Sequence, residues 1–246
     1  MSLFTPDYFV LDFETGGFSG TNGFRPVEIA VLSFVGGKTS LRSTLVNPYD
    51  DPYFEISPDA EQVHGISREK VLQHGQPAKD LMLGVHAYLN RPENAKLPIW
   101  AHNGVKFDFP LFNSEAARYG LPPLPASRLR DSAALYKGRA MGTKQQPGES
   151  MHAYFLRVLN TPRRGLLFNL KLISETVLLG LNRKDPEDQN SNLIADPSLG
   201  MSDETLQKIG SLGAHRAGYD VAITHALVQT FIHDPYFKEF KNDAGS

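Results

Sequence analysis

Short runs of hydrophobic residues along the chain predict β-strands separated by turns. Two of these runs, YFVLDF and VEIAVLSFV, are continuous enough for buried strands, whereas SLRSTLV alternates between polar and apolar positions. Gly36 and Gly37 separate the second run from the third, which is typical of a hairpin. The segments predicted as strands are residues 8–13, 27–35, 40–46, 98–101 and 128–131.

Elsewhere, hydrophobic residues recur at the three- to four-residue spacing of amphipathic helices. Asp131 or Ser132 can cap the helix that follows the last strand. The segments predicted as helices are residues 76–90, 107–119, 151–159, 169–179, 203–209 and 217–232. Strands that first precede and then alternate with helices indicate a single α/β domain over residues 1–246, with a mixed five-stranded sheet and flanking helices.

Composition narrows the classes of protein and site that remain. The 246 residues are 41% hydrophobic, which is enough for a full globular core. No apolar run approaches the roughly 20 residues of a membrane span, and the N-terminus has no secretory pattern, so we expect a cytoplasmic protein with no membrane contact. The absence of cysteine excludes disulfides and thiolate sites and agrees with a reducing compartment. A metal would bind carboxylates or histidine, and oxygen ligands favour Mg²⁺ or Mn²⁺.

Charge is distributed unevenly, although the formal net charge is only -2. Residues 128–171 hold nine basic and two acidic side chains, so this segment carries +7 and the rest of the chain -9. Such a segment is a candidate footprint for a polyanion, and the alternative is that folding scatters its charges over the surface. Its basic residues are Arg128, Arg130, Lys137, Arg139, Lys144, Arg157, Arg163, Arg164 and Lys171.

Two carboxylates stand at the end of the first predicted strand. Because side chains alternate along a strand, Asp12 and Glu14 share a face and lie about 7 Å apart. Neighbouring carboxylates repel unless a cation lies between them. The glycine-rich turn that follows, residues 15–17, lets a ligand approach the backbone closely. The alternative is an ordinary solvated strand end.

Two further acids and one histidine stand at the ends of predicted helices. Asp108 lies in the first turn of a helix, where capping is the alternative interpretation. Asp220 shares a core-facing stripe with Leu227 and Phe231, and a carboxylate there is costly unless it is paired or bound to a metal. His215 belongs to the loop or first turn before Asp220, which suits a general base above a metal site; the alternative is a surface histidine.

Taken in order, these motifs resemble the DEDDh family of 3′–5′ exonucleases, the DnaQ-like group with a ribonuclease-H-like fold. The resemblance spans about residues 8–232, and lesser matches occur in family order at Val63-His64-Gly65-Ile66 and Arg130-Asp131-Ser132. The main motifs are Asp12 to Phe18, then Ala101-His102-Asn103 with Phe107-Asp108, then His215 to Asp220.

The chain departs from the family pattern in three places. Thr15 and Gly16 stand where the family usually has Thr-Thr, which bears on how these two residues would grip the terminal nucleotide. The turn over residues 19–26 is long. A basic segment at about residues 138–165 looks like an insertion. Its residues expected to contact upstream phosphates of the substrate are Arg139, Lys144, Arg157, Arg163 and Arg164.

The resemblance implies a site for two divalent cations, Mg²⁺ or Mn²⁺. Asp12, Glu14 and Asp220 would hold one ion, Asp12 would reach the second, and Asp108 would help through water. His215 would accept the proton of the attacking water, since its free pKa lies near neutrality. The product would be a nucleoside 5′-monophosphate released from a 3′ end.

The remaining candidates concern contacts to the substrate. Phe18 either stacks on the terminal base or packs on the fold as a turn aromatic. His64 either fixes a loop or touches the edge of the substrate, and Asn103 either bonds near the site or holds its turn.

The function expected is a DNA 3′–5′ exonuclease for repair, proofreading or nucleotide recycling, with single strands favoured and a polymerase partner compatible with it. One alternative is an RNA 3′-end trimming enzyme, because the same site hydrolyses both polymers and discrimination depends on contacts to the 2′-OH. Another is a catalytically inactive nucleic-acid-binding module, which the presence of all four carboxylates and His215 disfavours. No sequence feature demands a dimer.

Overall fold

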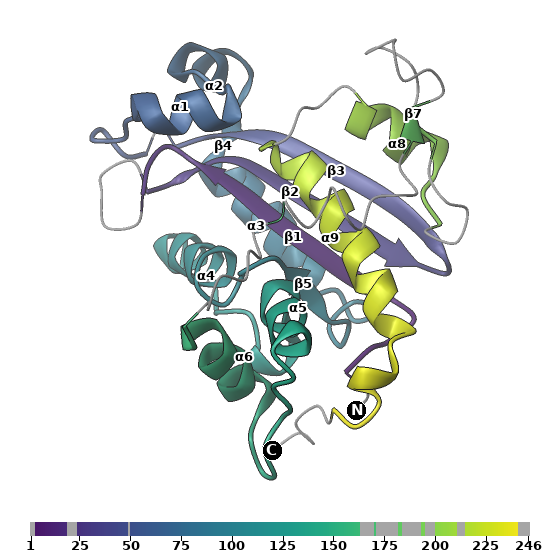
Figure 1. Cartoon of the computed structure of the whole chain (residues 1–246). Helices are drawn as coiled ribbons and strands as arrows, with labels where there is room; N and C mark the ends of the chain where they lie inside the picture. Colours follow the sequence, from purple (N-terminus) through teal and green to yellow (C-terminus); the bar gives the residue numbers. More distant parts are fainter. Residues whose placement is uncertain are drawn as a thin grey trace.

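A six-stranded mixed sheet forms the centre of the computed structural model (Figure 1), in the order β4-β3-β2-β1-β5-β6. Its strands are β1 (Tyr8–Thr15), β2 (Pro26–Val35), β3 (Lys38–Asn47), β4 (Gln76–Pro77), β5 (Ile99–Ala101) and β6 (Leu129–Asp131). The structure describes residues 3–18, 24–48, 50–162, 170, 182–183, 193–194, 200–210 and 215–240.

The three long strands form an antiparallel meander, and the shorter strands extend it in parallel. Gly36 and Gly37 make the turn between β2 and β3 with φ angles of 59° and 75°, a conformation that suits glycine. All five predicted strands are present. The sixth, β4, is the start of the segment predicted as a helix over 76–90, because Gln76 precedes a proline and is biased toward extended backbone.

Helices cover both faces of the sheet (Figure 1), as predicted for an α/β domain. Two of them, α1 and α2, were not predicted, although Ser57 and Ser67 cap them and Pro58 opens the first, all recognisable start signals. Apart from residue 170, the predicted helix over 169–179 lies outside the described residues. The helices are α1 (Pro58–His64), α2 (Arg68–His74), α3 (Ala78–Leu89), α4 (Asp108–Arg118), α5 (Ser132–Ala140), α6 (Met151–Asn160), α8 (Asp203–Gly210) and α9 (Ala217–Ile232).

Alternation along β1 divides its side chains between two cores. Phe9 packs edge-on against Tyr88 of α3, with ring centroids 5.5 Å apart, on one face of the sheet. On the other face the hydroxyl of Tyr8 lies 2.8 Å from Nδ1 of His225 on α9. Asp12 and Glu14 continue the face of Tyr8, so the strand presents its acids on the side that α9 covers.

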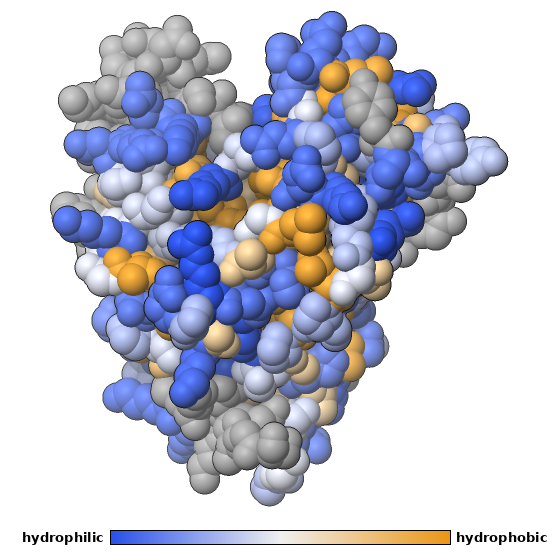
Figure 2. All heavy atoms as spheres, turned by 180° about the vertical axis from the view of Figure 1, so that it is seen from behind, coloured by the Kyte–Doolittle hydropathy of each residue, from blue (hydrophilic) through white to orange (hydrophobic). Residues whose placement is uncertain are grey.

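The side of the molecule away from α9 carries mostly hydrophilic side chains, with hydrophobic ones gathered near its middle (Figure 2). Within the described part of the chain, the longest helix, α9, has 16 residues. None of the described helices has the length and apolar character that crossing a membrane requires.

Candidate active site

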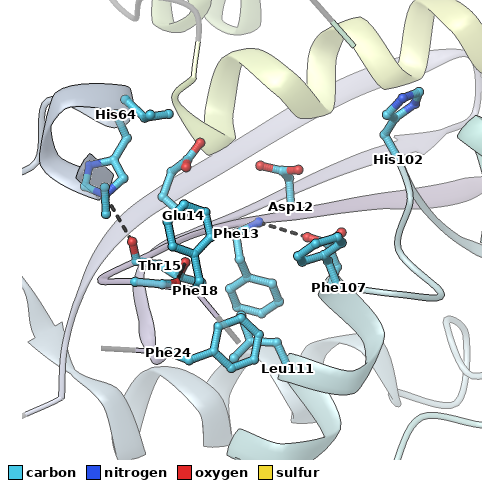
Figure 3. Close-up of a pocket in the computed structure, with 14 residues that line it drawn as sticks. Asp12, Phe13, Glu14, Thr15, Phe18, Phe24, His64, His102, Phe107 and Leu111 are labelled. Carbon is cyan, nitrogen blue, oxygen red and sulfur yellow. Dashed lines mark hydrogen bonds between the residues drawn. The ribbon is translucent and has the colours of Figure 1, made fainter. Parts of the chain in front are cut away.

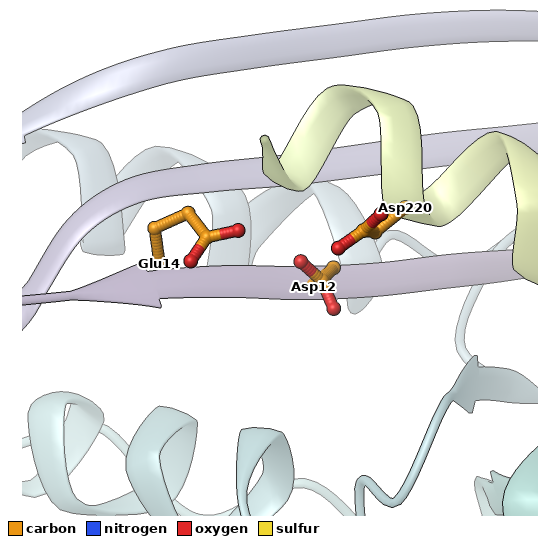
Figure 4. Close-up of side chains that lie close together, drawn as sticks. All are labelled: Asp12, Glu14 and Asp220. Atoms are coloured by element: carbon orange, nitrogen blue, oxygen red, sulfur yellow. The ribbon is translucent and has the colours of Figure 1, made fainter. Parts of the chain in front are cut away.

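Three carboxylates from two distant segments meet above the sheet (Figure 4). Asp12 and Glu14 rise from β1, and Asp220 points down from the first turn of α9. One oxygen from each side chain lies within 4.8 Å of the other two, and all three residues are half-buried. The structure therefore brings together the three acids that the sequence placed on a strand and on a helix stripe.

Asp108 adjoins this cluster without joining it. It is buried at the first position of α4, and its Oδ1 accepts a hydrogen bond of 3.2 Å from the backbone N–H of Phe13 (dashed in Figure 3). Phe13 lies between Asp12 and Glu14 in the chain, so this bond fixes Asp108 beside the strand segment that carries them.

The protein environment opposes negative charge on all four acids. Loss of hydration, followed by repulsion from Asp108, Asp220 and Glu14, raises the pKa of Asp12 well above its usual range. Burial and the neighbouring acids raise the pKa of Glu14 to about 9, and burial raises the pKa of Asp220 and of Asp108 to about 7. All the candidate ligands in this cluster are carboxylate oxygens, and the raised pKa values show that the acids are difficult to ionise together. Such a cluster fits a divalent cation such as Mg²⁺ or Mn²⁺, whose positive charge would stabilise the ionised carboxylates.

His215 lies two residues before α9, in the segment where the sequence placed it. Its φ angle is 62°, a left-handed conformation that is uncommon for a residue other than glycine. Strained backbone of this kind clusters at functional sites, where the surrounding structure holds it in place.

A cavity of about 280 Å³ opens beside the carboxylates (Figure 3). Asp12, Glu14 and Asp108 line its polar side. Phe18 and Phe107 stand at its apolar side and remain 67% and 49% exposed. Aromatic rings that face solvent beside an acidic cluster leave room for a flat, partly apolar ligand. The other lining residues are Phe13, Thr15, Gly17, Phe24, Ala60, Val63, His64, His102 and Leu111.

The end of β1 and the turn after it are held by backbone bonds to two other segments and by one side-chain bond within the turn. The N–H of Gly16 donates to the carbonyl of Arg25 at 3.1 Å, and the carbonyl of Gly16 accepts from the N–H of Ser57 at 2.7 Å. The hydroxyl of Thr15 donates to the carbonyl of Gly17 at 2.7 Å. Thr15, which lines the cavity, and Gly16 beside it are thus fixed in place, and their contact with a nucleotide stays a prediction.

His64 fixes a loop, one of the two roles considered for it, and it lines the cavity, while its contact with a substrate stays a prediction. Its Nδ1 accepts a 3.0 Å bond from the N–H of Ile66, so the proton of the neutral ring sits on Nε2, which donates to the carbonyl of Thr15 at 3.1 Å. Burial lowers the pKa of His64, which agrees with a neutral ring.

Asn103 holds its own turn, with a φ of 63° and a carbonyl that accepts from the N–H groups of Lys106 and Phe107. Asp131 caps α5, as expected, through a 2.9 Å bond from the N–H of Ala134. His102 lines the cavity, and its Nδ1 lies 2.9 Å from the hydroxyl oxygen of Ser132.

Two residues of the site were missed by the sequence analysis. Glu28 lies inside the apolar run of β2, directly across from Glu14, and it is buried. Arg216 lies between His215 and α9 and forms an ion pair with Glu28 at 2.8 Å. A charged residue inside a run that is otherwise apolar was the signal that could have identified Glu28.

The described part of the basic segment 128–171 does not form one continuous positive surface. This agrees with the alternative that folding scatters its charges, and it corrects the interpretation of the whole segment as a polyanion footprint. Arg128, Arg130 and Lys137 are buried. Lys137 donates to the carbonyls of Leu159 and Thr161 at the end of α6, because exposed carbonyls at a helix C-terminus attract cations.

The remaining described basic residues of this segment have acidic partners. Arg157 forms a two-bond pair with Glu149 at 2.6 and 2.7 Å, and Arg139 and Lys144 pair with Asp234 and Glu239. Arg163, Arg164 and Lys171 lie outside the described residues.

No protein-family model and no curated protein sequence matches the chain. Its fold, however, is similar to solved structures of exonuclease I. The complex of E. coli exonuclease I with a dA16 oligonucleotide matches with a TM-score of 0.56 and 17% identity, over 95% of this chain and 42% of that chain. The zinc-ion-bound E. coli ExoI–ssDNA complex matches with a TM-score of 0.56 and 17% identity, over 95% of this chain and 42% of that chain.

A further exonuclease I structure, described as suggesting how processivity is achieved, matches with a TM-score of 0.60 and 19% identity, over 92% of this chain and 41% of that chain. The chain therefore spans about two-fifths of the length of the exonuclease I chains that it matches. At such identities the likeness establishes the fold: a ribonuclease-H-like α/β domain of the kind found in exonuclease I.

Proposed function

We propose that this protein is a divalent-metal-dependent 3′–5′ exonuclease that releases nucleoside 5′-monophosphates, with single-stranded DNA as the favoured substrate. The observation that carries the proposal is the group formed by Asp12, Glu14 and Asp220, whose oxygens lie within 4.8 Å of one another beside an open cavity. The similarity of fold to exonuclease I supports it.

A phosphodiester is an anion, and four carboxylates at the same place would repel it. Asp12, Glu14 and Asp220 would hold one divalent cation, and Asp12 with Asp108 would contribute to a second. Bound cations of this kind neutralise phosphate oxygens and make the attacking water more acidic.

The chain's own residues have separable tasks in this mechanism. The imidazole of His215 would accept the proton of the attacking water. Phe18 and Phe107 would hold the terminal base against the apolar side of the cavity, since aromatic rings stack on bases regardless of sequence. The fixed turn formed by Thr15 and Gly16 would limit how far the terminal nucleotide enters.

The decisive experiment uses single strands of DNA and of RNA with the same sequence, each labelled at the 5′ end. With Mg²⁺ or Mn²⁺, the protein should shorten the DNA to a ladder and release 5′-monophosphates, and EDTA should stop the reaction. A strand blocked at its 3′ end should resist. The variant Asp220→Asn should be inactive, whereas Glu93→Gln, which changes an exposed acid away from the cavity lining, should behave as the wild type.

Two outcomes would contradict the proposal. Cleavage of a circular single strand would indicate an endonuclease, and full activity in EDTA would remove the metal from the mechanism. Faster shortening of the RNA strand would retain the exonuclease and reassign its substrate to RNA.

A further inference from the structure

Helix α9, which carries Asp220, is capped by a residue from another element. The N-cap residue, Arg216, makes no side-chain bond to the first turn of its own helix. The backbone N–H of Ala217 donates instead to Oε2 of Glu28, on β2, at 3.1 Å. A carboxylate at this position satisfies a free N–H and interacts favourably with the positive end of the helix dipole.

The same carboxylate is held by two further side chains. Arg216 donates from Nε to Oε2 of Glu28 at 2.9 Å and from Nη2 to Oε1 at 2.8 Å, which is the paired geometry of a strong ion pair. The hydroxyl of Ser43 on β3 donates to Oε1 at 2.7 Å. The side chain of Glu28 is 1% exposed, so the carboxylate at the centre of this clamp, formed by Glu28, Arg216, Ser43 and the N–H of Ala217, is shielded from solvent.

Glu28 is a poor candidate for a metal ligand, although it lies directly across from Glu14 in the sheet. Both of its oxygens already accept two hydrogen bonds each from the clamp. Its charge is matched by Arg216: burial works against ionisation, but the bonds from Arg216 and Ser43 lower the pKa of Glu28, whereas the pKa of Glu14 rises to about 9.

The clamp connects the two segments that form the candidate site, the end of β1 and the start of α9. On one side, Glu28 is fixed in register with Glu14 by the pairing of β1 and β2. On the other side, Arg216 directly follows His215, whose φ is 62°, and precedes Asp220 by one turn of helix.

The body of α9 has its own attachment to the core. Val221, Leu227 and Phe231 are buried among other hydrophobic residues. Loss of the clamp should therefore leave the helix in place and disturb mainly its first turn, together with His215.

We propose that Glu28 and Arg216 are positioning residues, which hold Asp220 and His215 against Asp12 and Glu14 so that all four act on the same metal-bound substrate. This inference rests on the proposed function. Partners that orient a metal ligand from outside the coordination sphere typically affect metal affinity or activity by about 10–100-fold when they are removed.

The test compares Glu28→Gln, which keeps the shape and removes the charge, with wild type in two assays. Titration with Mn²⁺ alone, followed by calorimetry, should show an affinity at least about tenfold weaker. On a short single-stranded DNA, kcat should fall by about 10–100-fold while KM changes little, because the substrate-binding cavity is intact. Arg216→Lys should give a kcat and an Mn²⁺ affinity between those of wild type and Glu28→Gln, since lysine keeps the charge of arginine without its two-bond geometry.

A matched control is available in the pair of Glu149 and Arg157, which has the same two-bond geometry but lies in α6 and the loop before it. Glu149→Gln should leave kcat and Mn²⁺ affinity unchanged. Ser43→Ala, which removes one bond of the clamp, provides a milder variant should Glu28→Gln fail to fold, and we expect about a fivefold loss of kcat and of Mn²⁺ affinity.

The proposal is overturned if folded Glu28→Gln, or Ser43→Ala in its place, keeps both kcat and Mn²⁺ affinity within twofold of wild type. It is also overturned if Glu149→Gln lowers kcat and Mn²⁺ affinity as much as Glu28→Gln does, because the effect would then be one of general stability. Failure of the proposed function is distinguishable: a wild type that degrades no nucleic acid would refute the nuclease, while the Mn²⁺ titration would still decide whether the clamp positions the acids.

Discussion

Replacing Asp220 by asparagine should make the metal-free protein more stable while it abolishes catalysis. The acids in the cluster are buried and held close together, so without a cation their loss of hydration and mutual repulsion act against folding. Asparagine has nearly the same shape as aspartate but carries no charge. The substitution therefore separates the energetic cost of the cluster from the packing of α9.

The size of the effect follows from the pKa of Asp220, which burial raises from 3.8 to about 7. Between these two values the folded protein holds a proton that the unfolded chain has released, so stability falls as pH rises through this window. A rise of about three units corresponds to about 4 kcal/mol of unfolding free energy lost above pH 7. Because a buried amide is itself costly to desolvate, we expect Asp220→Asn to recover about half, or about 2 kcal/mol.

Thermal unfolding in EDTA measures this directly. For a chain of this length, about 2 kcal/mol should raise Tm by about 4–8 °C at pH 8. The gain should disappear near pH 4, because Asp220 of the folded wild type is then as neutral as the asparagine. Saturating Mg²⁺ or Mn²⁺ should reverse the order, because only the wild type keeps all its ligands and gains about 2.7 kcal/mol at one hundred times Kd. Asp80→Asn, the same change at an exposed position of α3, should give no rise. A metal-free Asp220→Asn protein that melts at or below the wild type at pH 8 would refute the reasoning.

His215→Ala should lower kcat by about 10²–10⁴-fold with Mn²⁺ affinity largely retained, and alkaline pH should partly restore the rate, since hydroxide replaces the lost base; wild-type turnover at neutral pH would remove His215 from the mechanism. Phe18→Ala should raise KM about tenfold with little change in Tm, because the ring is 67% exposed and stacking on a base contributes about 1–3 kcal/mol; an unchanged KM would assign the ring to the fold. Replacing Arg163 and Arg164 together by glutamine should reduce the salt dependence of long-strand binding by about 0.7 per lost contact while sparing a dinucleotide, and an unchanged slope would show that they do not touch the substrate.

The local features of this protein could be predicted from its sequence. The five strands follow from runs and alternation of apolar residues, and the shared face of Asp12 and Glu14 follows from the two-residue repeat of a strand. Asp220 was expected on the core side of its helix because the helical repeat places it in line with Leu227 and Phe231. These properties depend only on the geometry of a single element.

The tertiary structure decided which charges meet. Arg216 and Glu28 are 188 positions apart, and nothing local distinguishes that arginine from one on the surface. Lys137 looked like part of a basic surface and is instead buried against the carbonyls that end α6. The partner of a charged side chain depends on which helix end or strand edge the fold brings close to it. Neither composition nor periodicity shows which distant segments will lie side by side. The same reason explains why the acids could be found from sequence, whereas the clamp that aligns them required the packing of α9 on the sheet.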